Sequence, residues 1–414
     1  MRTKMRSTRR FHHGFRRRPG QGAPWPVIRL LLAALGLLSG GMGTRTAAQL
    51  QFTGQVAGAY LQSGNTGQSQ YVVDNGRGTF TSRLDLFGDA VISENVTFRS
   101  ALRILQDQAI HIDQAALQVS DVTPLRLTFE AGVIDLPFGD LGDRRYPMKN
   151  PFLDLPLMNE HLTTLRTTDA QLWPFDNRYI AGGNGIRLLD QGLYDVGVKV
   201  SSDIDIVDLS VALMNGSVSS SSMYSGGGLD PGTGIGGVAR CSVTPAECFT
   251  AGISYAHGYL YGAPPVYAYS VAENGPSFPQ NSYEADVSFS VDHVQVYGQV
   301  LYSVWDMTER IGADLNAWAY SVEAQYVFLP RWTVSARAGA LQFNTITTTI
   351  QGPAYQPVIF NDRWDADVYR YEGALGYRCD RSVLVKLVYV WTAEGNIPSR
   401  AVTPLVAAQA VCSF

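Results

Sequence analysis

The sequence predicts an all-β fold: a transmembrane antiparallel β-barrel of about 16 strands. Three observations predict it. Apolar and polar residues alternate along most of the chain after residue 48. Short polar turns alternate with long segments rich in glycine, serine, asparagine and proline. The chain ends on Phe414, an aromatic residue that closes an alternating segment. Alternating segments of roughly ten residues separated by turns are typical of barrels that cross a membrane.

The first 48 residues predict an export signal outside the fold. They hold ten of the 32 basic residues and no acidic residue. An apolar stretch, Leu30–Leu38, follows, and small residues before Gln49 offer a cleavage site. These are the three parts of a secretory signal, and the apolar stretch is too short to span a membrane. We therefore expect cleavage near Ala48 and a barrel formed by residues 49–414.

The composition argues against a bundle of membrane helices and against a nucleic-acid-binding protein. Charged residues make up 16% of the chain, and the residues after the signal retain 22 basic against 36 acidic side chains. Mean hydropathy is -0.03, and no apolar run after the signal is long enough for a membrane helix. Because no basic stripe is present, we expect no nucleic-acid partner.

The alternating segments are clearest at four places: Gln49–Tyr60, Val96–Ile104, Leu125–Val133 and Trp318–Tyr326. The connections between such segments are alternately short and long, as in barrels with short periplasmic turns and long external loops. Short turns are expected near Ser93–Asn95, Asp121–Pro124, Ser202–Asp203, Thr244–Glu247, Asp292–His293, Leu329–Arg331 and Cys379–Arg381. Long loops are expected near residues 62–76, 135–185, 215–232, 259–280, 306–314, 344–365 and 392–401.

Aromatic residues distinguish this pattern from a secreted β-sandwich or β-helix, which also alternates. A membrane barrel carries tyrosine and tryptophan near its strand ends, at the level of the lipid head groups. The residues expected in such a girdle are Tyr60, Tyr255, Tyr302, Trp305, Trp318, Tyr326, Trp332, Tyr369, Tyr377, Tyr389 and Trp391.

The last segment predicts the location of the protein. Val406, Ala408, Ala410, Cys412 and Phe414 share one face. A terminal aromatic residue on such a strand resembles the signal that the bacterial outer-membrane barrel insertion machinery reads. We therefore expect the outer membrane, its lipid and that machinery as the surroundings of the folded chain.

Short motifs resemble a known family. Gly132 and Pro137-Phe138-Gly139 stand at the end of one segment, and Asn215-Gly216 ends a later one. Leu329-Pro330-Arg331 and Gly376-Tyr377-Arg378 stand at later turns. Over most of residues 125–414 the chain resembles Gram-negative outer-membrane porins of the phosphate-selective porin O/P-like group. The resemblance implies a homotrimer and a third external loop, residues 135–185, that folds into the lumen and narrows it.

Charges on that loop and on the inner wall are the candidate site residues, since rings of charge set ion preference in channels. By parity with the apolar face, basic and acidic side chains both point inward. They either form a basic stripe that guides anions or pair across strands. The loop candidates are Asp140, Asp143, Arg144, Arg145, Lys149, Asp154, Glu160 and Arg166. The wall candidates are Arg83, Asp85, Arg99, Arg103, Arg126, Glu130, Glu323, Arg337, Arg370, Glu372 and Lys386, with Glu284 and Asp286 as further inward acids.

Four cysteines allow three pairings. Spacing favours Cys241–Cys248 across a turn and Cys379–Cys412 at one barrel end. Exported proteins meet an oxidising compartment, in which disulfides can form. The alternative is four free thiols.

The predicted function is passive diffusion of small hydrophilic solutes or ions. Sixteen strands leave a water-filled channel, whereas eight are filled by side chains. One alternative is a barrel plugged by its third loop, acting as receptor or as scaffold for a partner. A second alternative, an outer-membrane enzyme, is disfavoured because His111 and His257 have no obvious catalytic partner. The histidines also lack metal-ligand spacing, so we expect no metal, no cofactor and no enzymatic activity.

Overall fold

The computed structural model describes residues 49–63, 78–105, 110–124, 126–165, 185–219, 235–261, 277–308, 312–351, 357–395 and 403–414. The predicted export signal and Arg166 lie outside the described residues. The strands are β1 (Gln49–Ser63), β2 (Thr79–Ser93), β3 (Val96–Leu105), β4 (Ile110–Val119), β5 (Thr128–Asp135), β6 (Tyr194–Ile204), β7 (Val207–Met214), β8 (Gly236–Ala246), β9 (Phe249–Tyr261), β10 (Ser277–Val291), β11 (Val294–Trp305), β12 (Leu315–Leu329), β13 (Trp332–Phe343), β14 (Thr345–Gln351), β15 (Pro357–Arg363), β16 (Val368–Asp380), β17 (Val383–Glu394) and β18 (Thr403–Ser413).

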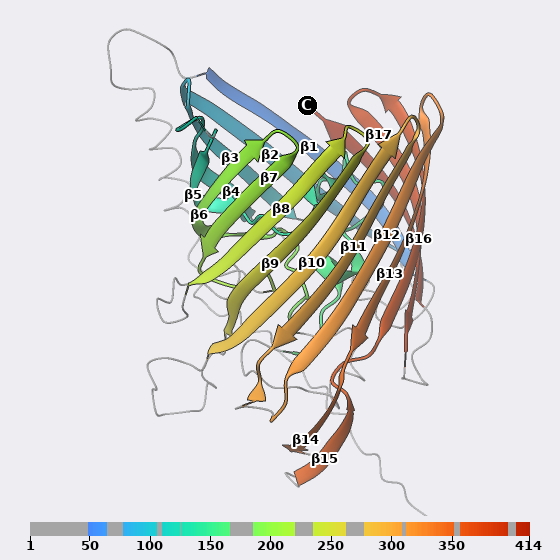
Figure 1. Ribbon diagram of the computed structural model, residues 1–414. Helices are drawn as coiled ribbons and strands as arrows, with labels where there is room; N and C mark the ends of the chain where they lie inside the picture. The colour runs from blue at the N-terminus through green and yellow to red at the C-terminus, as the bar shows by residue number, and fades with distance from the viewer. Residues whose placement is uncertain are drawn as a thin grey trace, which may run out of the picture. The chain divides into compact units, whose positions relative to one another are not determined.

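Sixteen of the described strands form one closed antiparallel barrel, as predicted (Figure 1). Each strand pairs with its neighbours in the chain, except that β13 pairs with β16 and leaves β14 and β15 as a separate two-stranded ribbon. The barrel closes where β1 pairs with β18. There Gly54 and Phe414 exchange two backbone hydrogen bonds of 2.9 Å. A Cβ on Gly54 would lie 2.6 Å from the Phe414 ring and 3.0 Å from the Asp85 carbonyl oxygen, so a side chain there would displace that ring.

The two ends of the barrel differ. The short turns and the C-terminus lie at one end, the short-turn end. The strand ends that the longer connections join, and the ribbon β14–β15, lie at the other, the long-loop end (Figure 1). One predicted turn is misplaced: β6 continues through Ser202–Asp203 to Ile204, and the chain reverses at Asp205 and Ile206. Asp205 has φ 56°, a left-handed conformation that aspartate tolerates better than most residues, and this fixes the turn two residues later.

Side chains alternate between the lumen and the outer face, as the period of two requires. Large apolar side chains on the outer face remain exposed, Phe80 by 73% and Ile253 by 64%. A ring of exposed apolar side chains of this extent is suited to lipid.

An aromatic row on the outer face includes three residues of the predicted girdle, Tyr255, Tyr302 and Trp318. Tyr255, Tyr283, Tyr302 and Trp318 are cross-strand partners on β9–β12, with ring centroids 5.2, 6.4 and 4.5 Å apart in that order. Trp305 is an exception to the prediction. It faces inward, is fully buried, and packs edge-on against Trp364 at 5.8 Å.

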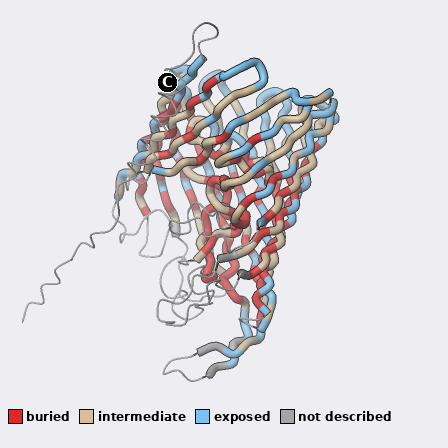
Figure 2. Tube along the Cα trace, turned by 90° about the vertical axis from the view of Figure 1, so that its left-hand side faces the viewer, coloured by how far each residue is buried: buried red, intermediate tan, exposed pale blue. Residues whose placement is uncertain are grey.

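The hydrophobic core lies inside the barrel, mainly in the half nearer the long loops, where the buried stretches are densest (Figure 2). Leu157, Leu165 and Leu188, from the long connection between β5 and β6, pack there against inward residues such as Leu301 and Phe343. This connection also contains the 3-10 helix η1 (Gly142–Arg145) and the helix α2 (Leu157–Glu160). No helix among the described residues is long and apolar enough to cross a membrane.

Candidate functional site

The connection between β5 and β6 folds into the lumen, as predicted for the third external loop, and we call its described residues, 136–165 and 185–193, the lumen loop. Within β5, just before the loop, Gly132 has a φ of +130° and lies so close to the Ala115 carbonyl that a side chain is excluded there. The loop backbone is bonded to the wall along its course. The Gly139 N–H donates to Ser254 Oγ of β9 at 3.0 Å, and the Met148 N–H donates to Gln55 Oε1 of β1 at 3.0 Å.

Lys386 of β17 holds the centre of the lumen loop. Its Nζ donates to three backbone carbonyls, those of Pro147 at 3.0 Å, Asn150 at 2.9 Å and Phe152 at 2.9 Å. The side chain is 1% exposed. A buried ammonium needs its donors satisfied, and here the loop backbone satisfies all three.

Arg337 of β13 holds the next part of the loop. Its Nη2 donates to the carbonyls of Asp154 at 2.7 Å and Leu155 at 3.1 Å, and its guanidinium lies 4.3 Å from the centre of the Phe152 ring. The same guanidinium donates through Nε to Glu372 Oε2 at 2.6 Å. Thus one buried arginine joins two wall strands to the loop.

Further contacts tie the loop to other sectors of the wall. Arg144 lies 3.6 Å from Glu323 Oε2 of β12, with its guanidinium 3.9 Å from the Tyr297 ring centre on β11. Near the long-loop end, the Thr164 N–H donates to Asp365 Oδ2 at 2.8 Å. Since the loop contacts Ser254 of β9 as well as Gln55 of β1, which lie far apart in the strand order, it crosses the lumen rather than following one wall.

The predicted loop charges fall into three groups. Asp143 and Lys149 are exposed in the lumen, while Asp140, Arg144 and Asp154 are half-buried. Arg145 and Glu160 are buried, and Arg145 donates to Asp135 Oδ1 at 2.9 Å and to the Gly192 carbonyl at 2.9 Å. These two therefore stabilise the fold of the loop and do not line a water path.

Several wall charges lie close to opposite charges, both within one strand and across neighbouring strands. Arg83 Nε lies 2.9 Å from Asp85 Oδ1, and Lys199 Nζ lies 3.0 Å from Glu130 Oε2. Arg370 Nη1 lies 3.8 Å from Glu372 Oε1. Each of these three positive charges is thereby offset at close range, which disfavours a continuous basic stripe along the wall.

Two wall predictions need comment. Arg126 does not point inward from a strand. It lies on the exposed turn before β5, with φ 51°, because β5 begins only at Thr128. Arg99 faces the lumen on β3 by parity with the buried Ala101 and is exposed there.

Sequence reasoning missed three wall residues that complete these pairs: Arg240, Asp113 and Lys199. Arg240 of β8 donates to Asp286 Oδ1 at 2.9 Å and lies 3.7 Å from Glu284 Oε2. Asp113 Oδ1 accepts from Arg103 Nη2 at 2.9 Å. Parity indicates that Arg240 faces inward, since it lies two residues from each of the buried residues Val238 and Ser242 and so shares their face of β8.

The predicted disulfides are wrong in this structure, where all four cysteines are free. Cys241 pairs in register with Ile253, well along the strand from Cys248 at the turn. Cys379 and Cys412 belong to β16 and β18, with β17 between them. Two strand spacings amount to about 9.6 Å, beyond the reach of a disulfide.

Within the described ranges, no group of three or more His, Cys, Asp or Glu side chains is arranged to hold a metal ion.

Burial of Glu160 predicts a pH effect on stability. Burial raises the pKa of this carboxyl above its ordinary value of 4.5, and Arg187 and Arg370 offset part of that rise. The folded chain then holds the proton more tightly than the unfolded chain, so stability falls as pH rises through the raised pKa. Relative to Glu160→Gln, wild type should gain unfolding free energy on acidification from neutral pH, by up to about 1.4 kcal/mol per pKa unit of the rise.

Urea unfolding of the detergent-solubilised barrel at several pH values measures this difference. Glu94→Gln, at an exposed turn, is the matched control. The same pH slope in both variants would count against burial as the cause.

No family model matches the chain, and no curated protein matches it by sequence. Solved outer-membrane barrels match its fold. The anion-selective porin from Comamonas acidovorans aligns with TM-score 0.56 and 8% identity over 89% of this chain and 100% of the porin. OprB of Pseudomonas putida aligns with TM-score 0.55 and 11% identity over 94% and 97% of the two chains. OmpT of Vibrio cholerae, folded in vitro, aligns with TM-score 0.53 and 11% identity over 90% and 99%.

At these identities the comparisons show the fold alone, and they place it in one class of structure, the closed antiparallel β-barrel that these solved outer-membrane proteins have. Within that class they do not single out the phosphate-selective group that the sequence motifs resemble.

Proposed function

We propose that the mature chain forms a water-filled pore in the bacterial outer membrane, through which small hydrophilic solutes or ions diffuse passively. The observation that carries this proposal is a closed sixteen-strand barrel whose inward side chains include paired arginines, lysines and carboxylates. A barrel of this strand number is wide enough for an aqueous channel. The lumen loop narrows that channel and exposes Lys149 and Asp143 to it.

Export and assembly belong to the same proposal. Residues 1–48 direct the chain to the outer membrane and are removed, and residues 49–414 form the barrel. The expected assembly is a homotrimer. A trimer form of OmpT from Vibrio cholerae, aligned with TM-score 0.50 and 10% identity, supports that expectation.

A plugged barrel that acts as receptor or scaffold is the second candidate function. The observation in its favour is the hydrophobic cluster inside the lumen, in which the lumen loop packs on the wall through residues such as Leu157, Leu165 and Trp305. A loop packed in this way could seal the pore completely.

Single-channel recording of the refolded mature protein in a planar bilayer, under a KCl gradient, separates the two functions. Stepwise conductance is the result expected of the pore. A correctly folded barrel that stays silent, with native circular dichroism and heat-modifiable mobility on a gel, would favour the plugged barrel instead.

Lys149→Glu is expected to shift the reversal potential toward cation preference. Lys149 is exposed on the lumen loop, so the change replaces one positive by one negative charge where the path is narrow. Arg126→Glu makes the same change in charge at an exposed turn and is the matched control. Equal shifts in the two variants would show that net charge acts, and not the position on the loop.

A further inference from the structure

The ribbon β14–β15 stands at the long-loop end, beyond the strands that close the barrel (Figure 1). Its two strands pair from Thr345 with Arg363 to Gln351 with Pro357, and neither pairs with another described strand. One of its faces is open to solvent, where Ile359 is 76% exposed. The ribbon is therefore a short, internally bonded projection that can be reached from the long-loop side.

Two residues at the root of the ribbon, Trp364 and Asp365, bond directly to the lumen loop. The Thr164 N–H donates to Asp365 Oδ2 at 2.8 Å, and the Thr164 hydroxyl donates to the Trp364 carbonyl at 3.0 Å. His161 Nε2 of the loop lies 4.0 Å from the same Asp365 oxygen. All four residues are buried, and a buried hydrogen bond is costly to break because it leaves polar groups without partners. The ribbon and the loop are thus bonded to each other as well as to the wall.

The root of the ribbon is also tightly packed. The Trp364 ring centre lies 4.7 Å from that of Phe343, and its Nε1 donates to the Asn316 carbonyl at 2.9 Å. Ile346 of β14 belongs to the same buried cluster as Trp364 and Leu165 of the lumen loop. Because protein interiors are packed as densely as crystals, they transmit a displacement and do not absorb it. A shift of the ribbon at its root therefore reaches the lumen loop.

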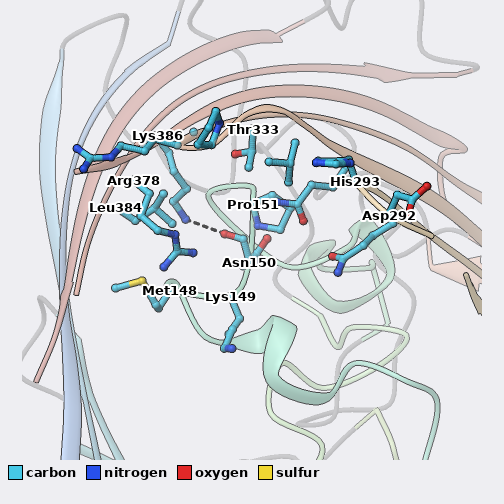
Figure 3. Close-up of a pocket in the computed structure, with 16 residues that line it drawn as sticks. Met148, Lys149, Asn150, Pro151, Asp292, His293, Thr333, Arg378, Leu384 and Lys386 are labelled. Carbon is cyan, nitrogen blue, oxygen red and sulfur yellow. Dashed lines mark hydrogen bonds between the residues drawn. The ribbon is translucent and has the colours of Figure 1, made fainter. Parts of the chain in front are cut away.

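An earlier part of the loop is anchored separately. Lys386 of β17 binds the carbonyls of Pro147, Asn150 and Phe152, and Figure 3 shows the bond to Asn150. The loop is therefore held at two places, by a side chain inside the barrel and by the root of the ribbon. Of these two anchors, the root is the one that continues into a projection beyond the barrel.

We propose that Asp365 positions the lumen loop by joining it to the ribbon, so that displacing the ribbon from the long-loop side shifts the loop and changes the conductance of the pore. Packed contacts of this kind have discrete arrangements and do not deform continuously, so a small displacement at the root moves the attached part of the loop as a unit. The change in conductance rests on the proposed pore function, whereas the joint between ribbon and loop does not.

Amide hydrogen exchange in the folded, detergent-solubilised barrel tests the joint apart from conduction. Asp365→Ala removes the acceptor of the Thr164 N–H, so exchange across residues 161–165 should rise about tenfold, as expected for one lost bond to a charged group. Asp367→Ala is the matched control, because Asp367 is an equally buried carboxylate of the root that accepts from the Phe343 N–H of β13 at 3.1 Å. It should leave exchange in the loop unchanged.

Asp365→Asn keeps one oxygen as an acceptor and should give an intermediate rate of exchange. It decides the question if the alanine variant does not fold. Loop exchange at the wild-type rate in the folded Asp365 variants, or an equal rise in Asp367→Ala, would overturn the joint.

Single-channel recording with a load on the ribbon tests the coupling to the pore. Thr349→Cys, at an exposed position of β14, is labelled with biotin maleimide, and streptavidin is added to the chamber facing the long-loop end. We expect a change in open-state conductance that Thr349→Cys/Asp365→Asn largely loses. Ile235→Cys carries the same load just before β8, where Ile235 is 69% exposed, and reports obstruction by streptavidin alone. Wild type labelled in the same way reports any label on the native cysteines.

Three outcomes would overturn the coupling in a barrel that conducts: no change from the load on Thr349→Cys, an equal change from Ile235→Cys, or a change that survives the loss of Asp365. A barrel that stays silent throughout would contradict the proposed pore, while the exchange rates would still decide the joint.

Discussion

Lys386→Met is expected to release the centre of the lumen loop and to raise the single-channel conductance, with larger fluctuations of the open current. The wild-type ammonium makes three hydrogen bonds to loop carbonyls, and methionine can make none of them. Bonds to a charged group contribute about 1.5–3 kcal/mol each, although the cost of burying the ammonium offsets part of this. A net loss of about 3 kcal/mol would shift the ratio of docked to undocked loop roughly a hundredfold.

The measurement is a comparison of open-state conductance and current noise between wild type and Lys386→Met under the same KCl solutions. Lys386→Arg keeps the charge and the donors and should restore much of the wild-type behaviour. Arg99→Met removes a lumen cation of β3, which is separated from β17 by three strands of the barrel, and it reports the effect of charge loss alone. If Lys386→Met conducts as wild type while its fold is intact, Lys386 does not hold the loop in place.

The contact between Lys386 and the lumen loop also shows how far the sequence could predict the site. The alternation of apolar and polar residues correctly places Lys386, Arg337 and Glu372 on the inner face, because parity along a strand depends only on local sequence. The partners do not follow from parity. That the Lys386 ammonium would bind the carbonyls of a loop more than 230 residues away depends on the path of that loop across the lumen.

The errors have the same origin. Arg126 fits the alternation of its neighbours, yet the start of β5 at Thr128 leaves it on a turn. Cys379 and Cys412 stand at the same end of the barrel, yet β17 separates them. Turn geometry and strand order are set by tertiary pairing, which a period of two cannot encode. The strand count was predictable because each long or short connection leaves its own compositional mark.

Arg337→Met should destabilise the barrel strongly, because it leaves buried carboxylates without their cation. Glu372 Oε2 accepts from Arg337 Nε at 2.6 Å, and Glu323 Oε2 lies 3.6 Å from Arg337 Nη1. All three side chains are buried. Removing one partner from a buried ion pair typically costs about 3–5 kcal/mol, because the remaining charge is uncompensated.

The double variant Arg337→Met/Glu372→Gln decides whether the uncompensated charge of Glu372 causes the loss of stability. Neutralising Glu372 should recover a large part of the lost unfolding free energy in urea, while the loop carbonyls of Asp154 and Leu155 stay without their donor. Recovered stability together with a raised conductance would separate the two tasks of Arg337, which are to compensate the wall acids and to hold the loop. If the double variant is as unstable as Arg337→Met, the loss comes from the loop contacts and the Phe152 packing, and the ion pair contributes little to stability.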